Sequence, residues 1–180
     1  MNNEELLLSQ LKSPSTREKA FRELITLNKE RLYWHIRKIV ISHDDADDVL
    51  QNTFIKVFRS IDKFKGDSKL FSWMYRIATN EAITHLNKNA KRLQTSNEEV
   101  QNQAVNNLTS DVYFDGNDIQ LKLQKAIATL PQKQQIVFNM KYFDDLKYKD
   151  MSDILETSEG ALKASYHIAV KKIEAYLTGN

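Results

Sequence analysis

The sequence predicts an all-α protein, built from two small helical domains joined by a flexible linker. Glycine occurs only 4 times and proline twice in 180 residues, which leaves few of the turn residues that strand-rich folds require. Apolar residues make up 41% of the chain, enough for a real core, and they recur at helical spacing over most of its length. An acidic strip at 93–118 interrupts this period and separates an N-terminal domain at 1–92 from a C-terminal domain at 119–180.

Three helices are expected in the N-terminal domain. The first begins at Ser15 or Thr16, either of which can act as its N-cap. The second follows the acidic cluster at 44–48, and the loop at 63–69 separates it from a third helix at roughly 70–90. Each expected helix carries an apolar side chain at every third or fourth position, so we expect the three to pack around one core.

The strip at 93–118 has the composition of a linker. It contains five carboxylates, no Lys or Arg, and eight Asn or Gln residues, and it shows no sustained helical period. We therefore expect at most a transient turn of helix there. Net charge divides in the same way, at +5 for residues 1–92, −5 for the strip and +2 for residues 119–180.

Four helices are expected in the C-terminal domain: one near 119–130, one after Pro131, a short one at 148–155 and a long one at 159–177. A two-residue break separates the last two, which is the pattern of a helix-turn-helix. On the outer face of the last helix stand small and polar side chains, namely Lys163, Ala164, Ser165, His167 and Lys171. Such a face can enter the major groove of DNA, although an ordinary helical hairpin with a solvated face has the same pattern.

Several functions are disfavoured by composition. The chain has no Cys, hence no disulfide, Cys-ligated zinc site or catalytic thiol, and this fits a reducing cytoplasm. No signal peptide is expected at a start with two early Glu residues, and no apolar run approaches the roughly 20 residues of a membrane span. With four scattered His residues and no glycine-rich phosphate loop, we expect neither an enzyme nor a cofactor.

The acidic cluster at 44–48 has two possible interpretations. Asp44, Asp45, Asp47 and Asp48 could form a metal site, but the spacing lacks the glycine and the terminal glutamate of a calcium loop. Carboxylates at the start of a helix also oppose its dipole. We therefore expect no metal.

A second nucleic-acid signal lies at 63–92, where the loop and the helix that follows it combine basic and aromatic side chains. The mixture suits single-stranded DNA, because cations meet phosphates and rings hold unstacked bases. Phe71 and Trp73 could equally belong to the core, and Trp73 is expected to lie mainly there. The basic residues of the segment are Lys63, Lys65, Lys69, Arg76, Lys88, Lys91 and Arg92.

These segments resemble the extracytoplasmic-function (ECF, group IV) sigma factors of bacterial RNA polymerase. The N-terminal resemblance is carried by HDDADDVLQNTF at 43–54 and FSWMYRIATN at 71–80, and the C-terminal one by LPQKQQIVF at 130–138 and SEGALKASYHIA at 158–169. The sequence departs from the family pattern at Asn52, where an acid is usual, and at Ser165, Ile168 and Val170, where Arg is frequent. Fewer guanidinium groups imply fewer phosphate or guanine contacts.

The resemblance implies a non-enzymatic, cytoplasmic subunit that directs core RNA polymerase to promoters by reading duplex DNA at −35 and capturing the melted strand at −10. Its implied partners are promoter DNA, the clamp coiled coil of the largest polymerase subunit, the β flap and, as is common in the family, an anti-sigma factor. The resemblance places polymerase binding on Asp48, Gln51 and Asn52. It places the −10 contact on Lys65, Asp67, Ser68, Lys69, Phe71, Arg76, Asn80, Lys88 and Arg92. It places the −35 contact on Ser158, Gly160, Lys163, Ala164, Ser165, His167 and Lys171.

The main alternative is a stand-alone helix-turn-helix regulator that binds duplex DNA without polymerase. The low net charge of residues 119–180 argues against it, because such a protein depends on its own phosphate contacts for affinity. A purely structural helical adaptor would explain the pattern if neither basic face binds nucleic acid.

Overall fold

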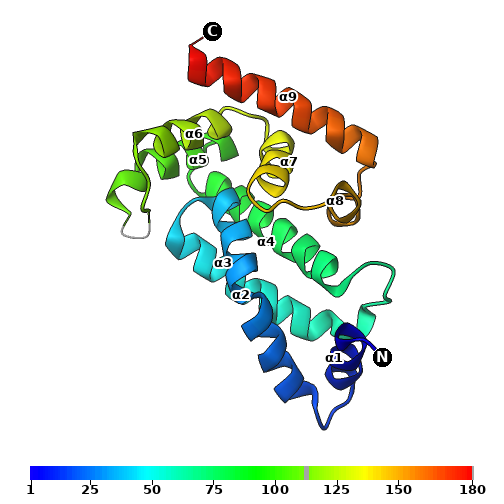
Figure 1. Cartoon of the computed structure of the whole chain (residues 1–180). Coiled ribbons are helices and arrows are strands. Elements are labelled where there is room, and N and C mark those ends of the chain that lie inside the picture. Colours follow the sequence, from blue (N-terminus) through cyan, green and yellow to red (C-terminus); the bar gives the residue numbers. More distant parts are fainter. Residues whose placement is uncertain (112–113, 180) are drawn as a thin grey trace.

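The computed structural model describes residues 1–111 and 114–179, and every regular element within those ranges is helical, as the sequence predicts. Figure 1 shows the helices arranged in two layers, with the N-terminal helices on one side and the C-terminal helices α7, α8 and α9 on the other. The elements are α1 (Asn3–Lys12), α2 (Arg17–Val40), α3 (His43–Ser60), η1 (Ile61–Lys63), α4 (Leu70–Arg92), α5 (Asn97–Asn106), η2 (Leu108–Ser110), α6 (Asp118–Ala128), α7 (Gln132–Tyr142), α8 (Tyr148–Leu155) and α9 (Glu159–Thr178).

The three expected N-terminal helices correspond to α2, α3 and α4, which pack against one another around an apolar core. Ser42 caps α3, because its side chain accepts a hydrogen bond from the amide of Asp45. A further helix, α1, precedes them. It is fixed at its start by a capping box, in which the side chain of Asn2 accepts from the amide of Glu5 and the side chain of Glu5 accepts from the amide of Asn2.

The segment at 93–118, expected to be a linker with at most a transient turn of helix, contains a ten-residue helix, α5, and the short turn η2; residues 112 and 113 lie outside the described part of the chain. Ser96 caps α5, and the buried side chain of Gln101 donates to the carbonyl of Ile39 at 3.0 Å. The side chains of Val105 and Leu108 are buried in a small apolar cluster. Long-range contacts thus stabilise a helix whose own apolar period is too weak to predict it.

Both helical modules contribute to one apolar core. Residues of α7 pack against α2 and residues of α8 pack against α4, so the two modules are in direct contact (Figure 1). The buried members from the C-terminal side are Ile136, Val137, Met140, Leu146, Met151, Ile154 and Leu162. The domain boundaries at 92/93 and 118/119 stay predictions.

The C-terminal module contains the expected helix-turn-helix, formed by α8 and α9. Glu156, the residue after α8, adopts a left-handed backbone conformation with φ of 51°, which turns the chain out of the helix. Ser158 then caps α9, because its hydroxyl accepts from the amide of Ala161 at 3.2 Å. Leu162, Ala169 and Ile173 form the buried stripe of α9, so the opposite face is left to solvent.

Candidate nucleic-acid interface

The outer face of α9 carries the predicted −35 residues. Ser158, Gly160, Lys163, Ala164, His167 and Lys171 are all exposed, and Ser165 is half-buried. The ammonium of Lys163 lies 5.5 Å from the ring centre of Tyr148 on α8, so the two helices of the motif share this end of the surface. Because α9 lies on the outside of the molecule, its predicted reading face can approach a duplex (Figure 1).

The predicted −10 loop runs between two buried apolar anchors, Phe64 and Leu70. Lys65, Asp67 and Lys69 are exposed between them, and Ser68 is half-buried. The loop turns at Gly66, whose φ of 82° is readily adopted only by glycine. A short exposed loop with two cations and fixed ends suits contact with a nucleic-acid strand.

Two of the predicted −10 cations are already engaged by the C-terminal module. Lys69 Nζ lies 2.9 Å from Oδ1 of Asp150 in the first turn of α8. Arg76 donates through Nε and Nη2 to the backbone carbonyl of Asp153, and its Nη1 lies 3.5 Å from Glu156. The acidic side of α8 therefore occupies part of the surface that was predicted to hold the −10 strand.

The other predicted −10 residues differ in accessibility. Phe71 is half-buried, and the guanidinium of Arg31 lies 3.8 Å from its ring centre, so one face of the ring is covered. Asn80 is exposed and lines a crevice of about 220 Å³ between α4 and the C-terminal module. Lys88 and Arg92 are exposed near the far end of α4. Trp73 packs against Phe64 at the edge of the core, with ring centres 5.3 Å apart.

The predicted polymerase-binding residues lie on α3, where Asp48, Gln51 and Asn52 are all exposed. Beside them runs an apolar groove of about 820 Å³ between α2 and α3, which includes the exposed side chains of Ile55 and Phe58. This groove was not predicted from the sequence. A signal was present, because the apolar positions of α3 cover a wider arc than one buried stripe requires. An apolar groove with a polar rim is typical of a protein-docking surface.

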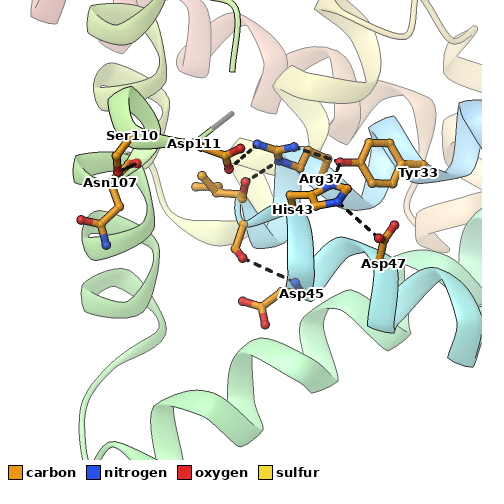
Figure 2. Close-up of polar contacts among 10 residues, drawn as sticks. Tyr33, Arg37, His43, Asp45, Asp47, Asn107, Ser110 and Asp111 are labelled. Atoms are coloured by element: carbon orange, nitrogen blue, oxygen red, sulfur yellow. Dashed lines mark hydrogen bonds and ion pairs between the residues drawn. The ribbon is translucent and has the colours of Figure 1, made fainter. Parts of the chain in front are cut away.

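The acidic cluster at 44–48 makes contacts within the protein (Figure 2). The imidazole of His43 lies 3.3 Å from Asp47, as Figure 2 shows. Outside that view, His85 on α4 lies 3.0 Å from Asp45. Within residues 1–111 and 114–179, no group of His, Cys, Asp or Glu side chains is arranged to hold a metal ion.

A second network in Figure 2 ties the segment after α5 to the N-terminal module. Arg37 donates to the carboxylate of Asp111 at 2.8 Å, to the carbonyl of Ile41 at 2.5 Å and to the hydroxyl of Tyr33 at 2.9 Å. Tyr33 in turn hydrogen-bonds to Nδ1 of His43 at 2.6 Å. The segment is therefore attached at a buried arginine, which contributes to its order.

The contact between the modules contains a buried polar network centred on Asp144, in the loop between α7 and α8. Its Oδ1 lies 2.5 Å from Nζ of Lys38, and its Oδ2 accepts from the hydroxyl of Tyr75 at 3.3 Å. Nδ1 of His35 lies 3.7 Å from Oδ2, an electrostatic contact rather than a hydrogen bond. Nε2 of His35 bonds to Thr79 at 2.7 Å, and the imidazole stacks on the ring of Tyr75.

Burial and charge act on this network in opposite directions. Burial lowers the pKa of His35 below its ordinary value, and Asp144 offsets only part of that effect. Burial alone would raise the pKa of Asp144, but His35 and Lys38 together outweigh it, so this pKa is lowered. The aspartate is therefore ionised and the imidazole neutral near pH 7, and Lys38 supplies the balancing charge.

These surfaces define a class of protein: a helical DNA-binding protein with a helix-turn-helix, an exposed loop that carries Lys65 and Lys69, and an apolar groove on a separate face. No helix in the described part of the chain is long and apolar enough to span a membrane.

Comparison with known proteins identifies the family. Sigma-70 region 2 matches residues 24–92, and Sigma-70 region 4 matches residues 120–173. The ECF RNA polymerase sigma-E factor of Haemophilus influenzae is 28% identical over 165 residues, covering 87% of each chain. The ECF RNA polymerase sigma factor SigW of Bacillus subtilis is 26% identical over 157 residues, covering 82% of this chain and 83% of the relative.

Solved structures show the same fold. The structure of CnrH in complex with the cytosolic domain of CnrY matches with a TM-score of 0.72 at 20% identity, over 99% of both chains. The sigma factor RpoE of Bartonella quintana, solved in complex with the anti-sigma factor NepR, matches with a TM-score of 0.67 at 20% identity, over 89% of this chain and 98% of that one. The chain belongs to the sigma-70 family, as an ECF sigma factor of RNA polymerase.

Proposed function

We propose that this sigma factor docks on core RNA polymerase through α3, reads the −35 duplex with α9 and captures the melted −10 strand with the loop at 65–69 and the adjoining face of α4. The observation that carries the proposal is the docking face on α3. This face combines an exposed apolar groove with the polar side chains of Asp48, Gln51 and Asn52 at its edge, the arrangement expected where a protein partner docks.

On α3, the proposed contact divides into two parts. The groove that contains Ile55 and Phe58 would bury apolar side chains of the clamp coiled coil in the largest polymerase subunit. Asp48, Gln51 and Asn52 would pair with polar groups at its rim and fix the register. Apolar burial supplies most of the affinity in such an interface, and the charged rim supplies specificity.

On the DNA side, Lys163, His167 and Lys171 would meet the edges and phosphates of the −35 duplex, while the first turn of α9, capped by Ser158, approaches the backbone. The cations of the −10 surface would hold phosphates of the opened strand. The chain performs no chemistry of its own and requires no cofactor. It acts in the cytoplasm, where its partners are promoter DNA, core polymerase with its β flap, and an anti-sigma factor.

The contact between the modules must open for this to happen. In this closed arrangement Lys69 and Arg76 already contact α8, and the crevice beside Asn80 is lined by α7 and α8, so a DNA strand would have to displace these contacts. Polymerase would favour the open arrangement by binding each module at a separate place, which shifts a two-state equilibrium. The closed state therefore weakens promoter contact by the protein alone.

Run-off transcription with purified core polymerase tests the proposal. New discrete transcripts should appear on genomic fragments when the protein is added, and they should disappear with Asp48→Ala plus Gln51→Ala. The control Glu30→Ala removes an exposed carboxylate from α2 that does not line the groove, and it should leave the transcripts in place. If no transcripts form and the protein alone binds duplex DNA tightly, the chain acts as a stand-alone regulator.

A further inference from the structure

Helix α4 begins without a cap from its own preceding residue. Its N-cap position is Lys69, whose side chain makes no capping hydrogen bond. The amide of Leu70, the first residue of the helix, instead donates at 2.9 Å to Oε1 of Glu4, which lies on α1, 66 residues earlier in the chain. A carboxylate at this point satisfies an amide that has no partner within the helix, and it also opposes the positive end of the helix dipole.

The other end of the same loop is also held by α1. Lys12 Nζ, in the last turn of α1, donates to the carbonyl of Phe64 at 3.1 Å. Phe64 and Leu70 are the two buried residues that bound the exposed loop at 65–69. Helix α1 therefore places an anion on the backbone amide at one end of the loop and a cation on the backbone carbonyl at the other.

Helix α1 is itself firmly placed. Leu11 is fully buried in the core, and Leu7 and Leu8 pack against it, so one face of α1 is fixed to the bundle. Eight residues separate Glu4 from Lys12, about 12 Å along a helix axis, which lets one rigid element reach both ends of a short loop.

We infer that Glu4 and Lys12 are positioning residues that hold the loop at 65–69 in the geometry that captures a base of the −10 strand. The inference rests on the proposed function of that loop. In the closed arrangement Asp150 also contacts the loop, through Lys69, but this contact is lost when α8 moves away. The two contacts from α1 lie within the N-terminal module and persist. A loop held in its binding geometry loses less conformational entropy when it captures a strand.

The test is carried out with the polymerase holoenzyme and a fluorescent single-stranded oligonucleotide that carries the −10 sequence of a start site mapped by run-off transcription. Each base is substituted in turn, and binding is followed by anisotropy. Glu4→Ala should lower discrimination at the captured base by about threefold to tenfold, the range expected for loss of a helix cap. Glu4→Gln keeps an oxygen that can accept from Leu70 and should restore most of the discrimination. Glu30→Ala, which removes an exposed carboxylate of α2, is the matched control.

Two further readouts separate positioning from general support of the fold. Hydrogen exchange at the amide of Leu70 should accelerate in Glu4→Ala, while affinity for core polymerase stays at the wild-type value. Lys12→Met should lower discrimination in the same direction, because it releases the Phe64 end of the loop.

Several results would overturn the inference. One is wild-type discrimination in Glu4→Ala, and another is an unchanged exchange rate at Leu70. A parallel loss of affinity for core polymerase would show that α1 merely supports the fold. If the wild-type holoenzyme itself shows no base preference on the oligonucleotide, the proposed −10 function fails and this inference fails with it. The measurement on the wild-type holoenzyme therefore distinguishes failure of the proposed −10 function from failure of the positioning role of Glu4 and Lys12.

Discussion

Replacing Asp144 with Asn should destabilise the contact between the two modules, because it removes the negative charge at the centre of the buried network. The side chain of Asp144 is 9% exposed and lies 2.5 Å from the ammonium of Lys38. Asn preserves the size of the side chain and one acceptor oxygen, but it leaves Lys38 without a counter-charge at the contact. The substitution therefore tests charge pairing rather than packing.

The expected magnitude follows from burial. Removing one partner of a fully buried ion pair costs about 3–5 kcal/mol. Lys38 is 17% exposed and can partly recover hydration, so we expect a loss of about 2–3 kcal/mol in the free energy of unfolding. For a chain of this size, 1 kcal/mol shifts Tm by about 2–4 °C, and the expected drop is therefore roughly 4–12 °C.

The neighbouring residue provides a matched control. Asp145 has the same side chain but is 94% exposed and lies 3.9 Å from Lys141. Its φ of 48° is a conformation that Asn tolerates, so Asp145→Asn should unfold close to the wild-type temperature. Thermal and urea unfolding followed by circular dichroism would measure both variants. Hydrogen exchange at the amides of α8 would show whether this helix is released from α4.

If Asp144→Asn and Asp145→Asn unfold within about 0.5 kcal/mol of each other, the network does not stabilise the closed arrangement. The packing of α7 and α8 against α4 would then rest on apolar burial alone. A loss of stability without faster exchange in α8 would place the effect within a module rather than between the modules.

Three other predictions follow from the same contacts. Since burial lowers the pKa of His35, the unfolded chain takes up a proton before the folded chain as pH falls through 6.5, and the free energy of unfolding should fall by up to about 1.4 kcal/mol per pH unit below that value. The variant His35→Gln, which can still bond to Thr79, should flatten this slope when unfolding is measured from pH 7.5 to 5.5. An unchanged slope would mean that another group causes the acid sensitivity. Lys163→Ala should weaken −35-dependent transcription and reduce the salt slope of holoenzyme binding to duplex by about 0.9, whereas an unaltered promoter preference would remove α9 from direct contact. Asp150→Asn should raise the affinity of the protein alone for a single-stranded −10 oligonucleotide by up to about fivefold, because it frees Lys69 from its ion pair. If the variant and the wild-type protein bind the oligonucleotide with equal affinity, this ion pair does not compete with DNA.

Local patterns predicted most of the elements. The helix-turn-helix followed from the break between 148–155 and 159–177, because the stripe of Leu162 and Ala169 and the cap at Ser158 are properties of short segments. The expectation of at most a transient turn of helix at 93–118 was wrong for α5, in which Gln101 reaches Ile39 across 62 residues. No local pattern contains that contact.

Much of the candidate surface was also predictable, since the side of a helix opposite its apolar stripe is exposed whatever the helix packs against. This held for Asp48, Gln51 and Asn52 on α3 and for Lys163 and Lys171 on α9. It did not predict that Lys69 and Arg76 contact α8 from the other module, although Lys69 stays exposed. Their roles as DNA contacts stay predictions.

The sequence alone determined the helical class, the family resemblance and the identity of the charged faces, because these depend on residue type and on spacing of a few positions. The tertiary structure decided what those faces meet. Asp144 lies in a short loop with no motif around it, yet folding places it between Lys38 and Tyr75. Glu4 is an ordinary residue of a first helical turn until the fold brings it to the amide of Leu70. Contacts between residues distant in the chain arise from the packing of whole helices, and a local pattern carries no record of that packing.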